Sequence, residues 1–225
     1  MSTTQTFVAL PEPTDDRREA FTRCLSNVVR ILLLDVPPES EGRGRRSWEQ
    51  RARSALREAC REGIELPDTA FDALIAAAVH DPDPSFNRQF LEPALNAFGR
   101  RRVQSALLGC LRAGPDVERA GAARAWYWSA LPPRMPLVRA ENPAGCRVTE
   151  ADDESDVVTD WNKAALREFV DNEHLDVRRC ILPGLPLRKS AYPPELHDLV
   201  SAAVATARSH PDEYIRHRVE HQVGD

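Results

Sequence analysis

The sharpest candidate for chemistry is a pair of histidines near the end of the chain, in the string His217-Arg-Val-Glu-His221. Histidines four residues apart lie on one face of a helix and can hold one zinc ion, and a glutamate between them can activate a metal-bound water. That reaction needs a third protein ligand, and only residues 222–225 follow His221. We therefore expect no catalytic metal here, and adventitious metal binding is the stronger expectation.

Other motifs that carry chemistry are absent from the sequence. There is no G-x-G-x-x-G for a dinucleotide, no G-x-x-x-x-G-K-[ST] for a nucleotide phosphate and no G-x-S-x-G for a nucleophilic serine. The five cysteines are widely spaced and odd in number, which excludes a disulfide framework and a Cys-x-x-Cys site: Cys24, Cys60, Cys110, Cys146 and Cys180. We expect no enzyme activity and no cofactor, and a reducing cytoplasm fits the cysteines best.

The strongest binding feature is the aromatic triplet Trp126-Tyr127-Trp128. Three consecutive residues span about 200° of a helix, so a single buried stripe cannot take all three rings. At least one ring must face outward, and tryptophan and tyrosine are enriched among binding hot spots. We predict that the triplet contacts a partner, with packing of the next segment over this helix end as the equal alternative.

Residues 131–160 interrupt the pattern of the chain, with the proline-rich string LPPRMPLVRAENPAG followed by the acidic string TEADDESD. The segment holds three basic and seven acidic residues, so it carries most of the net charge of −5. We predict an inserted loop whose acids attract a basic protein partner. The acids assigned to the partner site are Asp152, Asp153, Glu154 and Asp156.

The positioning elements are predicted to be helices, because apolar residues recur at helical spacing and proline or glycine separates the stretches. The expected helices cover residues 15–34, 47–62, 69–80, 85–98, 100–112, 116–130, 161–170, 175–185, 194–209 and 212–223. The string Ser47-Trp-Glu-Gln reads as a capping box at the start of the second. No stretch alternates as a strand would, and no apolar run approaches the length that spans a bilayer.

These helices predict an all-α fold, a short α-solenoid of about five helical hairpins. An N-terminal arm (1–15) precedes hairpins one to three (16–130), and hairpins four and five (161–225) follow the proline-rich and acidic insert (131–160). A non-repetitive helical bundle is the alternative architecture.

Four of the expected second helices open alike, at DPSFNRQFL, PDVERAGAA, LDVRRCILP and DEYIRHRVE. Each string has an acid, an apolar residue and then an arginine, and these arginines are Arg88, Arg119, Arg178 and Arg216. The pattern resembles the second helix of HEAT repeats, a likeness that covers residues 68–130 and 160–223. The resemblance implies that the acid caps the helix and that the arginine joins neighbouring repeats.

The leading functional hypothesis is a scaffold or adaptor that binds another protein along the helical surface, because stacked repeats create such surfaces. One alternative is a nucleic-acid-acting protein similar to HEAT-like DNA glycosylases, with Trp126, Trp128 and Asp116 in its groove. The net acidity and the absence of a basic stripe make nucleic acid an unfavoured partner. A third hypothesis is an inhibitor or immunity-type protein that neutralises a basic enzyme through residues 150–160.

Overall fold

The computed structural model describes residues 14–37, 45–83, 85–131 and 150–223, apart from the side chains of 45–47 and 150–155. These residues form ten α-helices, three short 3-10 helices and no strand, which confirms the all-α prediction for the part of the chain that is described. None of the described helices is both long and apolar enough to cross a membrane.

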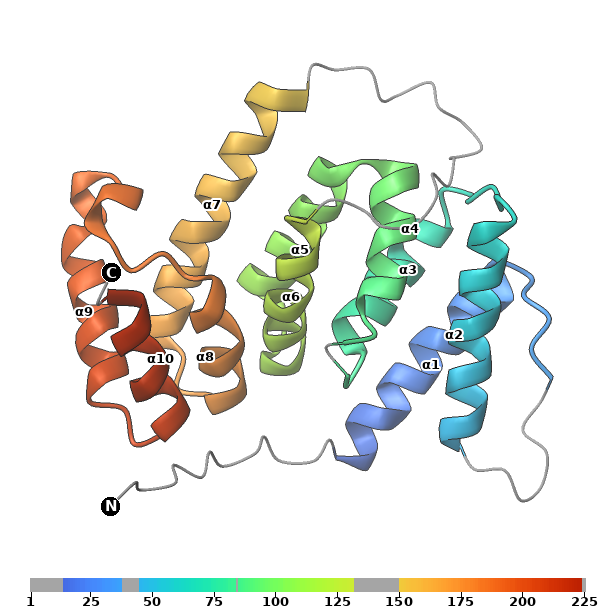
Figure 1. Cartoon of the computed structure of the whole chain (residues 1–225), viewed down its shortest axis with the longest axis horizontal. Helices are drawn as coiled ribbons and strands as arrows, with labels where there is room; N and C mark the ends of the chain where they lie inside the picture. Colours follow the sequence, from blue (N-terminus) through green and yellow to red (C-terminus); the bar gives the residue numbers. More distant parts are fainter. Residues whose placement is uncertain (1–13, 38–44, 84, 132–149, 224–225) are drawn as a thin grey trace.

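The helices follow one another along the long axis, from α1 and α2 at one end to α9 and α10 at the other (Figure 1). Their bounds are α1 Asp15–Ile31, α2 Arg45–Arg61, α3 Ala70–His80, α4 Arg88–Phe98, α5 Arg100–Ala113, α6 Asp116–Ser129, α7 Glu150–Asp171, α8 Leu175–Ile181, α9 His197–Arg208 and α10 Glu213–Val223. The 3-10 helices are η1 (Leu182–Gly184), η2 (Lys189–Ala191) and η3 (Pro194–Leu196). These ten helices correspond one to one with the ten that the periodicity predicts.

The packing contacts sort the helices into two rows. Helices α1, α3, α6, α8 and α10 pack in that order and form the first row, and α2, α4, α5, α7 and α9 form the second. The first two hairpins therefore start in the first row, whereas the last three start in the second. Between α4 and α5 the chain stays in the second row, where the two helices lie side by side. The connections between the other hairpins pass from one row to the other, so the order of the rows within a hairpin reverses at this point.

Gly99 makes this change of order possible, because it is the single residue between α4 and α5. Its backbone has φ 83° and ψ 152°, a region that is essentially restricted to glycine. A side chain at this position would strain the backbone, so the one-residue connection depends on glycine.

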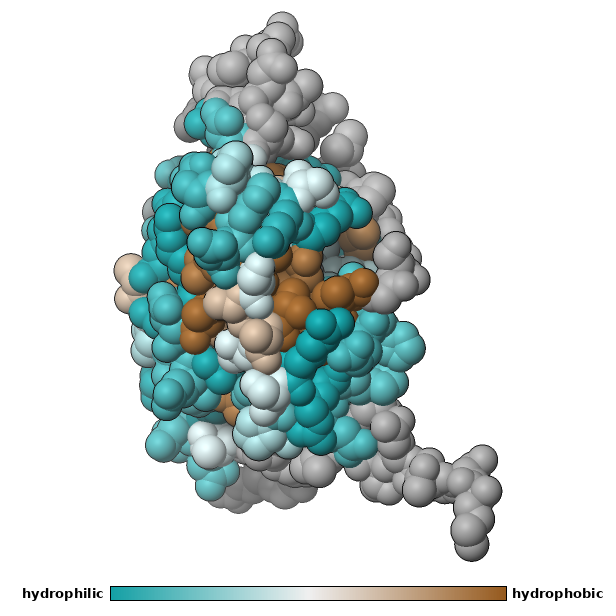
Figure 2. All heavy atoms as spheres, turned by 90° about the vertical axis from the view of Figure 1, so that its left-hand side faces the viewer, coloured by the Kyte–Doolittle hydropathy of each residue, from teal (hydrophilic) through white to brown (hydrophobic). Residues whose placement is uncertain are grey.

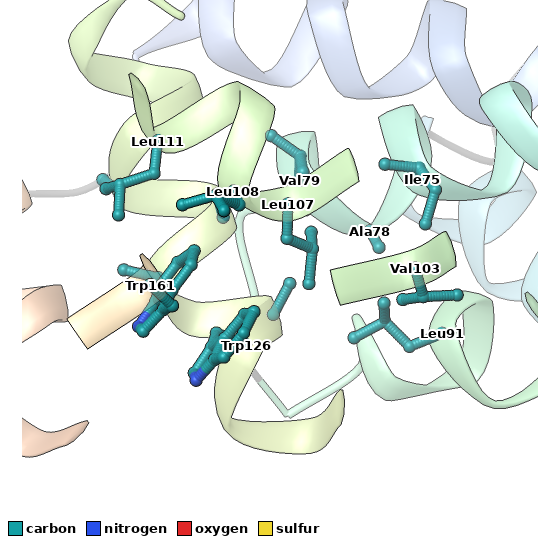
Figure 3. Packing of buried hydrophobic residues seen from close by; sticks show 14 of the residues in the cluster. Ile75, Ala78, Val79, Leu91, Val103, Leu107, Leu108, Leu111, Trp126 and Trp161 are labelled. Carbon is teal, nitrogen blue, oxygen red and sulfur yellow. The ribbon is translucent and has the colours of Figure 1, made fainter. Parts of the chain in front are cut away.

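The buried hydrophobic residues form one continuous cluster along both rows. Figure 3 shows its centre, where Val79 of α3, Leu107 of α5 and Trp126 of α6 converge. Burial of apolar side chains contributes roughly 25 cal/mol per Å² removed from water, so this cluster is the main source of stability. At the end of the molecule where α9 lies, Figure 2 shows apolar residues within a rim of polar ones.

Helices α3 and α6 of the first row approach each other closely at Gly121. A Cβ atom built at Gly121 would lie 2.8 Å from the carbonyl carbon of Val79 and nearer still to its oxygen, so no side chain fits there. Alanines flank the contact on both helices, including Ala77 and Ala78 on α3 and Ala120 and Ala122 on α6. Small residues therefore let the two backbones touch.

The boundary predicted for the insert is wrong. Helix α7 begins at Glu150, so residues 150–160 belong to a helix of 22 residues rather than to a loop. Acidic residues favour the first turn of a helix because they complement its dipole. Val157 and Trp161, four residues apart and both buried, continue the apolar stripe upstream. The rest of the predicted insert, residues 132–149, lies outside the described residues.

The helix starts also correct the prediction of a capping box, because α2 begins at Arg45 and Ser47 lies inside its first turn. The N-terminal arm predicted for residues 1–15 lies outside the described residues up to residue 13.

Gly121→Ala should lower the free energy of unfolding by about 1–3 kcal/mol or more, because a methyl group at this site overlaps the Val79 backbone. Gly109 is the matched control, since it is an exposed helical glycine with open space around it. Gly109→Ala should raise the free energy of unfolding by about 0.5–1 kcal/mol. Chemical denaturation measures both, and equal effects of the two substitutions would refute the close contact.

Candidate binding surface

The three aromatic residues at the end of α6 have different surroundings. The ring of Trp126 stacks on that of Trp161 from α7, with centroids 4.0 Å apart and planes 3° from parallel. Both rings are buried, and they are seen side by side in Figure 3. Trp126 is therefore a packing residue, which corrects the prediction that its ring is available to a partner.

Tyr127 is the ring that faces outward, with 60% of its surface exposed. Its ring meets that of Trp128 edge-on, with centroids 5.0 Å apart. Trp128 is partly buried, and the guanidinium carbon of Arg88 lies 4.9 Å from its ring centroid. The prediction that at least one ring of the triplet faces outward is confirmed by Tyr127.

The position of Arg88 depends on Glu92, one turn later in α4. The guanidinium donates to the Glu92 carboxylate at 2.7 Å from Nε, and Nη2 lies 2.6 Å from the same oxygen. Glu92 is buried, so its charge is compensated by this pair. Arg88 thus lies over Trp128, which contacts Tyr127 edge-on, and we call these three residues the aromatic cluster. It joins α4 of the second hairpin to α6 of the third.

The acidic residues assigned to the partner site lie in the first two turns of α7. Asp156 is exposed. The side chains of Asp152, Asp153 and Glu154 lie outside the described residues, although their backbone is helical. The structure therefore places these acids on a helix, with Asp156 five residues before Trp161.

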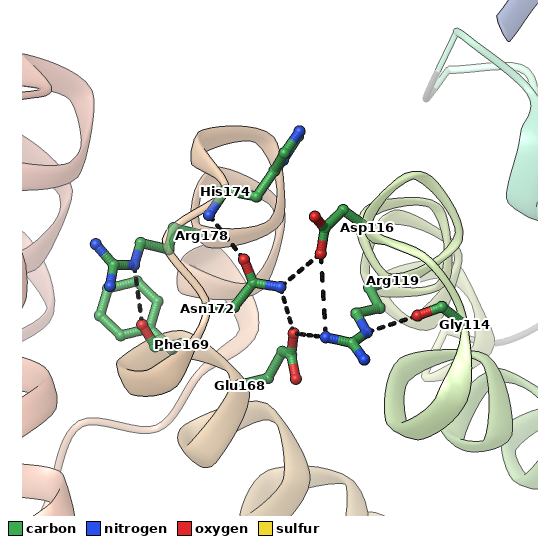
Figure 4. Close-up of polar contacts among 8 residues, drawn as sticks. All are labelled: Gly114, Asp116, Arg119, Glu168, Phe169, Asn172, His174 and Arg178. Carbon is green, nitrogen blue, oxygen red and sulfur yellow. Dashed lines mark hydrogen bonds and ion pairs between the residues drawn. The ribbon is translucent and has the colours of Figure 1, made fainter.

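A polar network joins the start of α6 to the end of α7 (Figure 4). Arg119 donates to Glu168 from Nη1 at 2.7 Å and to the carbonyl oxygen of Gly114 from Nε at 2.7 Å. Asn172 donates to Asp116 at 2.7 Å and to Glu168 at 2.6 Å. Arg119 therefore joins the third hairpin to the fourth.

The other arginines of the repeated pattern make a second kind of contact. Arg178 donates to the carbonyl oxygens of Phe169 and Val170, and Arg216 donates to those of His210 and Pro211. In both cases the acceptors end the preceding helix or follow it. These two arginines act within their own hairpins, which corrects the prediction that they join neighbouring ones.

The acids of the pattern also differ from one another. Asp212 caps α10 as predicted, since its Oδ1 accepts from the backbone N–H of Ile215 at 3.1 Å. The same carboxylate binds the buried guanidinium of Arg179 in a bidentate pair. Asp176 instead binds Arg17 of α1 at 3.0 Å and lies 3.6 Å from Arg124 of α6. The contact with Arg17 joins the first hairpin to the fourth.

A buried ion pair lies at the turn between α3 and α4. Arg53 of α2 donates to Asp81 at 2.8 Å, and its guanidinium also lies 4.6 Å from the ring centroid of Phe21. The second carboxylate oxygen of Asp81 has no hydrogen-bond partner within the described residues. Burial raises the pKa of Asp81 to about 6, although Arg53 acts in the opposite direction. No pattern in the sequence predicts this pair.

Among the described residues, those that could carry chemistry show no catalytic arrangement. No group of three or more histidine, cysteine or acidic side chains that could hold a metal occurs among the described residues. Burial raises the pKa of Cys60 and of Cys180 to about 11, so both thiols stay protonated and are poor nucleophiles. His217 and His221 lie close together on α10, with their Nε2 atoms 3.1 Å apart.

Comparison with protein families, with curated proteins and with solved structures finds no match to this chain. The function must therefore be argued from its own residues.

Replacing Arg119 with alanine should lower the free energy of unfolding by about 1–3 kcal/mol, because Gly114 loses a donor and Glu168 loses its ion-pair partner in a partly buried site. Arg178→Ala should also be destabilising. The matched control is Arg112→Ala, whose ion pair with Asp160 is half exposed, so its effect should stay below about 1 kcal/mol. Thermal and chemical denaturation test this, and an Arg119 variant as stable as the control would contradict it.

The contribution of Asp81 to the stability of the fold should fall as the pH rises from about 4 to 6. Asp81 ionises near its ordinary pKa of 3.8 in the unfolded chain but near 6 in the folded one, so the folded chain binds more protons in this window. Relative to Asp81→Asn, the parent protein should lose up to about 3 kcal/mol across the window. Denaturation curves at several pH values measure this, and parallel pH profiles of the two proteins would refute it.

Proposed function

We propose that the chain is a protein-binding scaffold whose two rows of helices form a short HEAT-like α-solenoid. Serial packing of five hairpins supports the solenoid, because each hairpin contacts mainly its neighbours. Arg119 supports the resemblance to HEAT repeats, since it joins successive hairpins from the expected position. The reversal of hairpin order at Gly99, where the chain stays in the second row, distinguishes this arrangement from a uniform one.

The observation that carries the binding proposal is the exposed ring of Tyr127 on the aromatic cluster. Glu92 fixes Arg88, Arg88 covers Trp128, and the edge of Trp128 supports Tyr127. A ring held in this way loses little conformational entropy when a partner covers it. Tyr127 is therefore suited to be the anchor of an interface, with Trp128 as its support.

The partner that fits best is a protein with a basic surface. The first seven residues of α7 contain five acids, namely Glu150, Asp152, Asp153, Glu154 and Asp156. Charges of one sign on one helix raise the association rate of an oppositely charged partner. The same observation supports the second candidate, an inhibitor or immunity-type protein, if the basic partner is an enzyme.

The glycosylase-like alternative has less support from the residues that it requires. Trp126 is stacked on Trp161 and buried, so it cannot stack on an extruded base. Asp116 accepts a hydrogen bond from Asn172 at 2.7 Å in the network between α6 and α7. Both residues therefore take part in packing between hairpins.

Tyr127→Ala should raise the dissociation rate of the partner about tenfold or more, because the anchor ring is removed while the helix remains. The partner is first captured from the native host with the parent protein and identified by mass spectrometry. Surface plasmon resonance then compares the parent protein, Tyr127→Ala and the control Leu33→Ala. Leu33 is an exposed apolar residue of the first hairpin, distant from Tyr127 in the sequence.

The control should bind like the parent protein. Conversion of Asp152, Asp153, Glu154 and Asp156 to the amides should slow association and reduce its dependence on salt. Unchanged kinetics for Tyr127→Ala, with a partner that the parent protein binds, would rule out the aromatic cluster as the anchor.

A further inference from the structure

The outward face of α10 brings two imidazole rings into contact. The Nε2 atoms of His217 and His221 lie 3.1 Å apart, and the ring centroids are 4.4 Å apart at an interplanar angle of 61°. His221 is exposed and His217 is partly exposed. The two nitrogens that could donate a lone pair to a metal therefore lie together at the surface.

Their separation matches what one metal ion requires. Zinc binds imidazole nitrogen at about 2.0–2.1 Å, which places two such nitrogens about 3.3 Å apart in a tetrahedral site and about 2.9 Å apart at a right angle. The observed 3.1 Å lies between these values. We propose that His217 and His221 chelate one borderline divalent transition-metal ion, of the kind represented by zinc, nickel and copper.

The rest of α10 holds this pair in place. Ile215 and Val219 are buried on the opposite face of the helix. Gln222 donates to the carbonyl oxygen of Leu182 at 3.0 Å, which ties the last turn to the preceding hairpin. The helix backbone thus sets the spacing of the two rings before any ion binds, and less entropy is lost on chelation.

The site is suited to binding an ion rather than to hydrolysis. Glu220, which would activate water in the catalytic form of this motif, instead accepts from Arg208 Nε at 3.1 Å. Within the described residues no third side chain joins the pair as a ligand. The remaining coordination positions are left to water, and imidazole is a preferred ligand of zinc, nickel and copper.

Binding uses the Nε2 lone pair of each ring. In the present contact one Nε2–H donates to the other Nε2. When both rings carry their proton on Nδ1, both Nε2 lone pairs can bind the ion, so no proton is lost overall.

The test is a titration of the full chain with zinc, nickel and copper chlorides by isothermal titration calorimetry. The parent protein should bind one equivalent, and His217→Gln and His221→Gln should each bind at least tenfold more weakly. The matched control is His174→Gln, because His174 is exposed and lies on another hairpin. It should bind like the parent protein.

A second readout does not depend on the variants. Zinc should protect His217 and His221 from carbethoxylation by diethyl pyrocarbonate, located by mass spectrometry, and should leave His174 as reactive as before. Equal affinity of the parent protein and both variants, or equal modification with and without zinc, would overturn the proposal.

Discussion

The close contact between α3 and α6 is the constraint on which the rest of the structure depends. Gly121 leaves room for the Val79 carbonyl group, so the two backbones meet without an intervening side chain. Because α6 also packs on α8, this contact connects the first two hairpins to the last three within one row. The same helix ends in the aromatic cluster, so the placement of Tyr127 depends on how closely α6 approaches α3.

Two kinds of interaction hold successive hairpins together, and they lie at different levels of α6. Near its start, Arg119 and Asp116 form a polar network with α7, which fixes orientation through directional bonds. Near its end, Trp126 and Trp161 provide apolar area and a stacked contact. Long-range pairs such as Arg17 with Asp176 add contacts between hairpins that are not neighbours in sequence.

The sequence predicts the helices well because their apolar spacing is local, but it does not predict which helices become neighbours. Arg88 shares its motif with Arg119, yet α4 lies in the other row, so Arg88 covers the ring of Trp128. The sequence does not predict the start of α7, because the acidic residues before Val157 obscure the helical spacing of Val157 and Trp161. Tyr127 as the outward ring, and the burial of Trp126, depend on contacts with α7 that no local pattern contains.

The reversal of hairpin order at Gly99 limits how such a chain can change its length. A duplication or loss of one whole hairpin on either side of Gly99 preserves the alternation of helices between the two rows. No single screw rotation relates all five hairpins, however, because the first two are wound in the opposite order to the last three. Gain or loss of whole hairpins is therefore confined to each side of residue 99, and the two sides would change in length independently.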